Sequence, residues 1–159
     1  MKMSIVCVGK IKEQFYRDAL AEYAKRLSRY VSWEIVEVAD EKTLDNASAA
    51  EERQVLATEG ERILKHLSDD AYKIALCIDG MKADSVGFAR MIEKIKLDGF
   101  SHIQFIIGGS LGLAPEVIKK ADRKLSFSDM TFPHQLMRVI LSEQVYRACR
   151  ISSNEPYHK

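Results

Sequence analysis

The sequence FIIGGSLGLAPEVIKKADRKLSFSDMTFPHQLMR, residues 105–138, decides the fold of this chain. It contains two short apolar runs, and each run ends in a loop whose residue types suit close contact between backbone and ligand. The first run enters Gly108-Gly109-Ser110-Leu111-Gly112, and the second, from Leu125, enters Asp129-Met130-Thr131-Phe132 before Pro133. Proline is favoured at the first position of a helix. Two strand-loop-helix junctions this close in sequence predict one pocket at the carboxyl ends of neighbouring strands, where open α/β sheets bind ligands.

Strand and helix patterns alternate along the rest of the chain. Short apolar runs predict five strands, at residues 3–8, 33–39, 74–78, 102–107 and 124–127. Apolar side chains at three- and four-residue spacings predict helices at residues 14–30, 48–67, 84–99, 114–121 and 133–150. Ser48 and Glu51 have the spacing of a capping box, and Asp79-Gly80 is predicted to close the third strand. The alternation indicates a parallel sheet that helices cover on both faces.

Length and composition fit one globular α/β domain over residues 1–159. A chain of 159 residues supports one well-formed core and is too short for two ordinary domains. Apolar residues make up 47% and charged residues 30%, which excludes a disordered chain. No apolar run approaches the ~20 residues of a membrane-spanning helix, and the first residues show no signal-peptide pattern. We therefore expect a cytoplasmic protein that makes no contact with a membrane.

Cysteine usage and net charge exclude further classes. Cys7, Cys77 and Cys149 are too few and too scattered for a disulfide scaffold. Cys7 and Cys77 lie in predicted strands, so we expect both to be small buried apolar residues. No Cys-x-x-Cys, His-Glu-x-x-His or His/Cys cluster is present, so no metal site is expected. The net charge is only +1, so if RNA is a partner, affinity must come from a local patch or from two subunits together.

The glycines at residues 108–112 do not match the common phosphate-binding motifs. A dinucleotide fingerprint requires Gly-x-Gly-x-x-Gly after the first strand, whereas here Gly-Gly-x-x-Gly follows the fourth predicted strand. A P-loop requires Lys followed by Ser or Thr after the glycines, and neither pair follows them. A tight turn in which the glycines adopt positive φ remains open as a purely structural explanation.

Long ordered segments carry a family resemblance. The segments IVCVGKIKEQFYRDALAEYAKRL, FIIGGSLGL, LSFSDMTFPHQLMRVILSEQVYRA and EPYHK span the whole chain. They are similar to the bacterial large-subunit rRNA pseudouridine N3-methyltransferases, the ribosomal RNA methyltransferase H family of the SPOUT class. The resemblance implies an α/β fold with a deep trefoil knot near the C-terminus. Because knots are nearly absent from proteins at large, the knot rests on the resemblance alone.

The resemblance also implies a reaction and its partners. Members of the family use S-adenosylmethionine to methylate N3 of a pseudouridine in 23S rRNA, within the ribosome or the 50S subunit. A homodimer is implied, in which the knot region and the last helix pack against a second subunit. Two alternatives remain open, a non-catalytic flavodoxin-like ligand-binding module and a SPOUT methyltransferase that acts on tRNA. The first leaves the FSDMTFPHQ loop and the PYHK tail unexplained, and the absence of an added RNA-binding domain argues against the second.

By position, the resemblance assigns the cofactor pocket to three segments. They are the third strand, the glycine loop and the loop after the fifth strand, with the residues Leu76, Gly108, Phe127, Ser128, Asp129, Met130, Thr131 and Phe132. An apolar slot lined by backbone groups suits adenine, and a glycine leaves room where the cofactor approaches the backbone. Taken alone, Leu76 is equally well a core residue, and Phe127 a buried strand residue.

The resemblance implies that the C-terminal tail helps to form the RNA site, because a Pro-Tyr-His-basic ending recurs in the family. From composition alone, a tail of this length is normally frayed. Removal of the N3 proton requires a positioned base, for which His158 is the first candidate, while Tyr157 positions or stacks on the flipped base. Lys159 is expected to meet a phosphate. Many relatives carry histidine where this chain has Glu155, and no role is assigned to that residue.

The last predicted helix carries two further candidates. His134 lies in its first turn, where the positive end of the helix should lower the pKa of the imidazole and keep it neutral. It is a second candidate for a role in RNA binding or in structure, local packing being the simpler alternative. Arg138 lies one turn later and is expected to reach the same loop or to bind an RNA phosphate.

Overall fold

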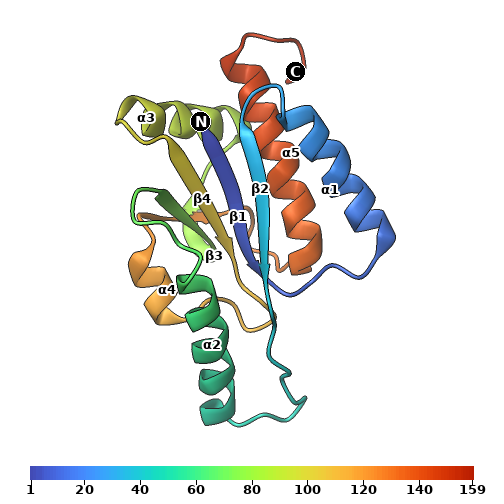
Figure 1. Ribbon diagram of the computed structural model, residues 1–159, viewed down its shortest axis with the longest axis vertical. Helices are drawn as coiled ribbons and strands as arrows, with labels where there is room; N and C mark the ends of the chain where they lie inside the picture. Colours follow the sequence, from blue (N-terminus) through green and yellow to red (C-terminus); the bar gives the residue numbers. More distant parts are fainter.

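Strands and helices alternate around one parallel sheet in the computed structural model, which describes residues 1–159 (Figure 1). The strands are β1 (Lys2–Val8), β2 (Ser32–Val38), β3 (Tyr72–Lys82), β4 (His102–Ile107) and β5 (Arg123–Ser126). The helices are α1 (Gln14–Leu27), α2 (Ala49–Leu64), α3 (Ser85–Leu97), α4 (Pro115–Lys120) and α5 (His134–Ser152). The strand order is β2-β1-β4-β3-β5, and every neighbouring pair is parallel. The predicted α/β class with a parallel sheet is confirmed.

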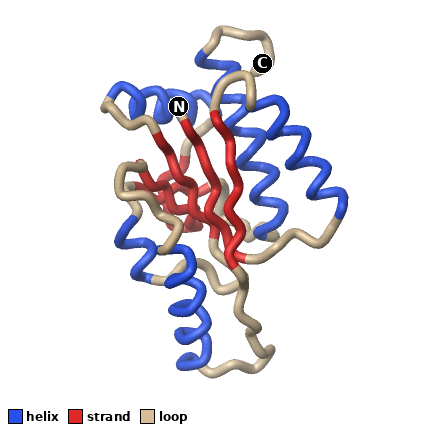
Figure 2. The backbone as a smooth tube through the Cα atoms, in the orientation of Figure 1, coloured by secondary structure: helices blue, strands red, loops and turns tan.

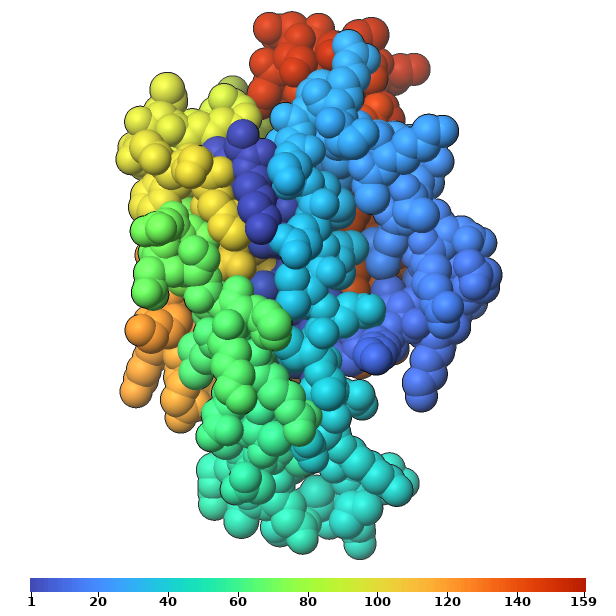
Figure 3. All heavy atoms as spheres, viewed as in Figure 1, coloured from blue at the N-terminus to red at the C-terminus, as the bar shows by residue number.

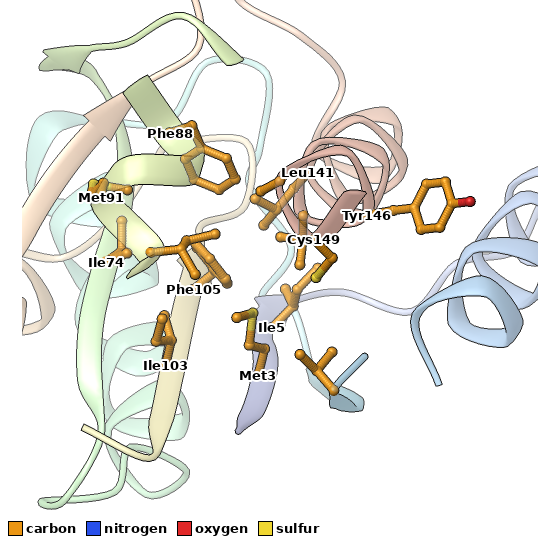
Figure 4. Close-up of a cluster of buried hydrophobic side chains, with 14 of the residues drawn as sticks. Met3, Ile5, Ile74, Phe88, Met91, Ile103, Phe105, Leu141, Tyr146 and Cys149 are labelled. Carbon is orange, nitrogen blue, oxygen red and sulfur yellow. The ribbon is translucent and has the colours of Figure 1, made fainter. Parts of the chain in front are cut away.

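Helices cover both faces of the sheet (Figure 2). On one face, α1 and α3 each pack against α5, and these helices enclose the larger apolar core with Met3, Ile5 and Phe105 (Figure 4). On the other face, α2 and α4 cover a smaller cluster that includes Val6 and Ile106. Successive strand residues point to opposite faces, so both faces of the central strands are apolar and the sequence reads as continuous apolar runs.

The predicted elements are present, with one substantial error in β3. The capping box of α2 is formed: the Ser48 hydroxyl accepts from the Glu51 amide, and the Glu51 carboxylate accepts from the Ser48 amide. The third strand does not close at Asp79-Gly80 but continues to Lys82, with a register shift against β5. A Cβ on Gly80 would lie 2.6 Å from the carbonyl carbon of Leu125. This glycine therefore serves the close approach of two strands and not a turn.

The three cysteines are free. Cys7 is buried, as predicted, and burial raises the pKa of its thiol to about 12. Cys77 is only half-buried, so its predicted burial is wrong in part. No helix combines the length and apolarity that crossing a membrane requires. His, Cys, Asp and Glu side chains nowhere gather in groups of three or more that could hold a metal ion.

Candidate functional site

A cavity of about 450 Å³ lies at the carboxyl ends of β4 and β5. Its walls come from the middle of β3, from residues 107–113, from the loop at residues 127–132, and from the start of α5. The volume lies within the range of small-molecule sites. The two junctions quoted from the sequence therefore do build one pocket, as their spacing predicted.

Seven of the eight residues assigned to the cofactor pocket line this cavity, namely Leu76, Gly108, Phe127, Ser128, Met130, Thr131 and Phe132. Asp129 is the exception, because its exposed carboxylate accepts a hydrogen bond from Lys82 Nζ at 2.7 Å and is not part of the lining. The position expected for Asp129 therefore needs correction. Sequence reasoning also missed Ile78 and Asp79 as lining residues. Ile78 ends the predicted strand, and Asp79 lines the cavity because β3 runs on past this point.

The glycine loop folds back on itself at the floor of the cavity. Gly112 has a φ of +85°, and its amide donates to the Gly109 carbonyl at 3.1 Å. A Cβ on Gly108 would overlap the carbonyl group of Gly112. The tight turn considered from the sequence is thus real, and it leaves a wall without side chains on which a ligand can lie against the backbone.

The buried carboxyl group of Glu59 lies next to the glycine loop. Glu59 of α2 is 4% exposed, and its Oε2 accepts from the Glu41 amide at 3.1 Å, while Oε1 has no hydrogen-bond partner. A Cβ on Gly109 would lie 3.2 Å from that oxygen. Burial raises the pKa of Glu59. Sequence reasoning missed this residue because an acidic side chain in an amphipathic helix is normally solvated.

The rim of the cavity is apolar and partly exposed. Ile78 is 53% and Met130 73% exposed, and both line the cavity. The loop that carries Met130 is held by Ser128, whose hydroxyl accepts from the Met130 amide at 3.0 Å. Large apolar side chains gathered at a cavity rim are typical of a surface that a ligand or a partner covers.

His134 lines the cavity from the first residue of α5. Its pKa is lowered from 6.5, as predicted, but the cause differs from the one expected. Burial of the ring is the largest cause, and the nearby Arg138 guanidinium adds to it, whereas Asp40 acts in the opposite direction. The imidazole is therefore held neutral by desolvation and by a neighbouring cation.

Arg138 does not lie where an RNA phosphate could reach it. Its side chain is fully buried: Nη1 donates to Glu37 at 2.9 Å, and Nη2 donates to the carbonyls of Val8 at 2.6 Å and Gly9 at 2.9 Å. A buried guanidinium with these partners anchors α5 to the carboxyl end of β1. The expected phosphate contact is corrected to an anchoring role, which an isolated arginine in a helical pattern does not reveal.

The C-terminal tail forms a separate cluster. The ring of Tyr157 packs edge-on against Tyr146 at 5.0 Å, its hydroxyl donates to Glu143 at 3.1 Å, and Arg147 lies 4.7 Å from its centroid. Burial and the Glu143 carboxylate raise the pKa of Tyr157. His158 is exposed, with Nδ1 3.4 Å from Arg147 Nη1, and Lys159 is exposed as well.

Glu155 has a defined place in this cluster. Its carboxylate accepts from the Tyr30 hydroxyl at 2.6 Å and pairs with Arg150 at 2.9 Å and with Arg29 at 3.5 Å. These contacts lower the pKa of Glu155, with the Tyr30 hydrogen bond as the largest cause. The residue to which the sequence assigned no role therefore fixes the tail against α5 and against the turn that follows α1.

The cavity and the tail lie at opposite ends of α5 (Figure 1). The helix has 19 residues, from His134 at the cavity to Ser152 before the tail, and at 1.5 Å per residue it spans roughly 27 Å. Within one chain, therefore, the predicted catalytic residues Tyr157 and His158 do not meet the predicted cofactor residues.

Over the whole length of the chain, comparisons with known proteins point to one family. Residues 1–158 match the family model described as "Predicted SPOUT methyltransferase". The chain is 60% identical to the ribosomal RNA large subunit methyltransferase H of Bifidobacterium adolescentis, and 57% and 56% identical to the proteins of the same name from Bifidobacterium animalis subsp. lactis and Clostridium botulinum. Each alignment covers 100% of both chains.

The fold is also similar to that of a solved structure. A probable methylase family protein from Haemophilus influenzae Rd KW20 superimposes with a TM-score of 0.55 at 15% identity. The match covers 99% of this chain and 70% of that one. At this identity the likeness concerns the fold alone.

Proposed function

The chain belongs to the SPOUT methyltransferase family, and we propose that it methylates the ribosomal RNA of the large subunit, at N3 of a pseudouridine in 23S rRNA. The observation that carries this proposal is the 60% identity, over the full length of both chains, to a relative named for large-subunit rRNA methylation. A flavodoxin-like module without catalysis and a tRNA-modifying enzyme have no comparable support.

The cavity residues fit S-adenosylmethionine. When bound, this cofactor supplies an electrophilic methyl group on a sulfonium ion. Leu76 and Phe127 give apolar walls suited to a purine, and Gly108 allows the tight 108–112 turn, whose backbone lines the cavity, because a Cβ there would overlap the Gly112 carbonyl. The neutral His134 avoids a positive charge beside a cationic ligand, and the carboxyl group of Glu59 lies behind the loop. The cavity therefore has a shape, an apolar lining and a charge distribution that suit S-adenosylmethionine.

The acceptor side of the reaction requires removal of the N3 proton, and we assign this step to the tail. His158 is exposed, and imidazole is the side chain that most often serves as a general base in enzymes. Tyr157 donates to Glu143 and has a raised pKa, so it stays protonated. It therefore suits a positioning role and not that of the base. Lys159, also exposed, remains the candidate for a phosphate contact.

A homodimer would join the two halves of the site. The tail lies roughly 27 Å from the cavity of its own chain along α5, so an antiparallel pairing of two α5 helices would bring the tail of one subunit to the cavity of the other. Leu136, Val139 and Ile140 of α5 are only half-buried in one chain and would be covered by such a partner. Arg138 takes no part in RNA contact in this proposal, because it is buried.

Three finer expectations accompany the proposal. Residues 1–159 act as one domain, whose test is a single cooperative unfolding transition. The chain contains a trefoil knot near the C-terminus, as the family resemblance implies. The enzyme works in the cytoplasm, where ribosomes are.

Two measurements test the function. Calorimetric titration with S-adenosylmethionine should show binding by the parent and by Leu97→Ala, which changes an 87% exposed residue of α3 outside the cavity, and none by a folded Gly108→Leu variant. Transfer of isotope-labelled methyl groups should then be seen on ribosomal particles and not on tRNA. Labelling of tRNA alone would move the proposal to the tRNA alternative, and a folded parent without binding or transfer would favour the non-catalytic module.

A further inference from the structure

The loop between β1 and α1 exposes an aromatic ring and several cations that the methyl-donor cavity does not use. Phe15, in the first turn of α1, is 65% exposed and is the only aromatic residue among the large exposed apolar side chains. Its ring packs against Tyr16, with centroids 4.3 Å apart. Lys10 and Lys12 are exposed in the loop just before it. An exposed ring beside basic side chains offers a flat surface on which an unpaired base can stack.

The backbone of this loop is held in one conformation. Ile11 is 8% exposed, and its amide donates to Glu37 Oε2 at 2.9 Å. Arg17 reaches back along the helix, and its side chain donates to the carbonyls of Ile11 at 3.1 Å and Lys12 at 3.0 Å. Lys10 and Lys12 therefore flank a buried anchor, and both side chains extend into solvent. A rigid loop presents its cations with little loss of conformational entropy on binding.

The same network connects the loop to the cavity. Arg138 binds the carbonyls of Val8 and Gly9 and the carboxylate of Glu37, which in turn holds Ile11. A Cβ on Gly9 would lie 3.7 Å from Nε2 of the cavity residue His134. The loop thus starts beside the cavity, at the end of the sheet where α5 begins (Figure 1). The start of α1 lies on the surface, in blue at the right of Figure 3.

We propose that residues 9–17, the β1–α1 platform, bind a single-stranded segment of the substrate RNA next to the methyl-donor cavity. Phe15, backed by Tyr16, stacks on an unpaired base, and Lys10 and Lys12 contact phosphates. Stacking on exposed aromatic rings next to basic residues is the general mode of single-strand binding. The segment contains three cations, Lys10, Lys12 and Arg17, and one carboxylate, Glu13. Its net positive charge therefore complements RNA. The inference rests on the proposed function and adds a substrate surface to it.

The test compares matched variants in methyl transfer to ribosomal particles. Phe15→Ala should raise KM for the particles on the order of tenfold, with kcat, the affinity for S-adenosylmethionine and Tm unchanged. Lys10→Glu with Lys12→Glu should raise KM and lower the slope of log KM against log salt by about 0.7 for each lost phosphate contact. The controls are Leu97→Ala, which removes an 87% exposed apolar side chain of α3, and Lys65→Glu, which changes a cation at the end of α2.

The outcomes separate this inference from the proposed function. If the parent methylates ribosomal particles and the platform variants match the Leu97→Ala and Lys65→Glu controls in KM and salt slope, the platform is excluded while the function stands. If the parent transfers no methyl group to the particles, the proposed function fails and the platform fails with it. A rise in KM that is confined to the platform variants supports the inference.

Discussion

Gly108 shows at the residue scale how a missing side chain shapes the cavity. A Cβ at this position would overlap the Gly112 carbonyl, which is backbone and has no rotamer by which to move aside. Glycine loops are usually explained by positive φ, but here only Gly112, not Gly108, lies in the left-handed region. Gly108 is therefore required for the space it leaves, and Gly112 for the turn that uses this space.

A Gly108→Ala variant tests this distinction. The added methyl group must push the 108–112 loop outward, and overpacking of this kind costs about 1–3 kcal/mol, so we expect affinity for S-adenosylmethionine to fall by up to roughly 140-fold, and by at least roughly 5-fold. Titration calorimetry measures the affinity, and Leu97→Ala serves as the control because Leu97 is exposed on α3 and does not line the cavity. Equal affinity in Gly108→Ala and the parent would show that the loop does not contact the cofactor.

Protonation of His134, a cavity residue, makes the free energy of unfolding depend on pH. Its folded-state pKa is lowered from 6.5 by burial and by Arg138, so between the folded and unfolded values the unfolded chain binds more protons. The free energy of unfolding therefore falls as the pH drops below about 6.5. His102 is shifted in the same direction, mainly by burial. Between about pH 7 and about pH 5, urea unfolding should show a smaller loss in the free energy of unfolding for His134→Gln than for the parent. An equal loss in both proteins would contradict this role of His134.

Residues differ in how far the sequence could predict them. Gly108 was predictable because it lies in a segment that resembles a family and at the end of an apolar run. Leu76 was assigned by its position in the third strand, as the resemblance implies. Glu59 and Arg138 were not, because the burial of a charged side chain depends on neighbours that are distant in sequence, such as Gly109 and the carbonyl of Val8. A helical pattern predicts such residues on the solvent face.

At the scale of elements, β3 determines the shape of the cavity. β3 pairs in parallel with β5 on both sides of a register shift between Leu76 and Met81, and three of the residues in between, Cys77, Ile78 and Asp79, line the cavity. The sequence predicted the strand but not its continuation, because Asp-Gly is also a strong turn signal. Only the presence of β5 against Gly80 distinguishes a bulged strand from a turn.

A Gly80→Ala variant tests the close approach of β3 and β5. Its Cβ would lie 2.6 Å and 2.7 Å from backbone atoms of Leu125, so β3 and β5 must separate, and we expect the free energy of unfolding to fall by about 1–3 kcal/mol. Asp79→Ala is the control on the same strand. Its ion pair with Lys124 is exposed, and such pairs contribute at most about 1 kcal/mol. Urea denaturation of both variants decides the matter, and an unchanged midpoint for Gly80→Ala would mean that the strands tolerate the added methyl group.

At the scale of the whole molecule, the predicted cofactor residues and the predicted catalytic residues lie at two separate places in one chain. The cavity residues and the tail residues were both predictable as groups, but their separation by the length of α5 was not, since sequence patterns carry no information on which ends of the elements meet. The same helix that anchors the cavity through Arg138 carries the tail at its other end. The proposed homodimer, in which each subunit completes the site of the other about a two-fold axis, is compatible with this geometry and with the half-exposed apolar residues of α5.

Mixed dimers test whether the site forms between subunits. Gly108→Leu disables the cavity and leaves the tail, and His158→Ala disables the proposed base and leaves the cavity, so each variant alone should be inactive. After subunit exchange at equal concentrations, half of the dimers are mixed, and each has one complete site if cavity and tail come from different chains. Methyl transfer should then recover to about a quarter of the parent value. If each site is built within one chain, no mixed dimer has a complete site, and the mixture stays inactive. Activity of His158→Ala alone would instead remove His158 as the base, and Tyr157→Ala would then take its place in the mixing experiment.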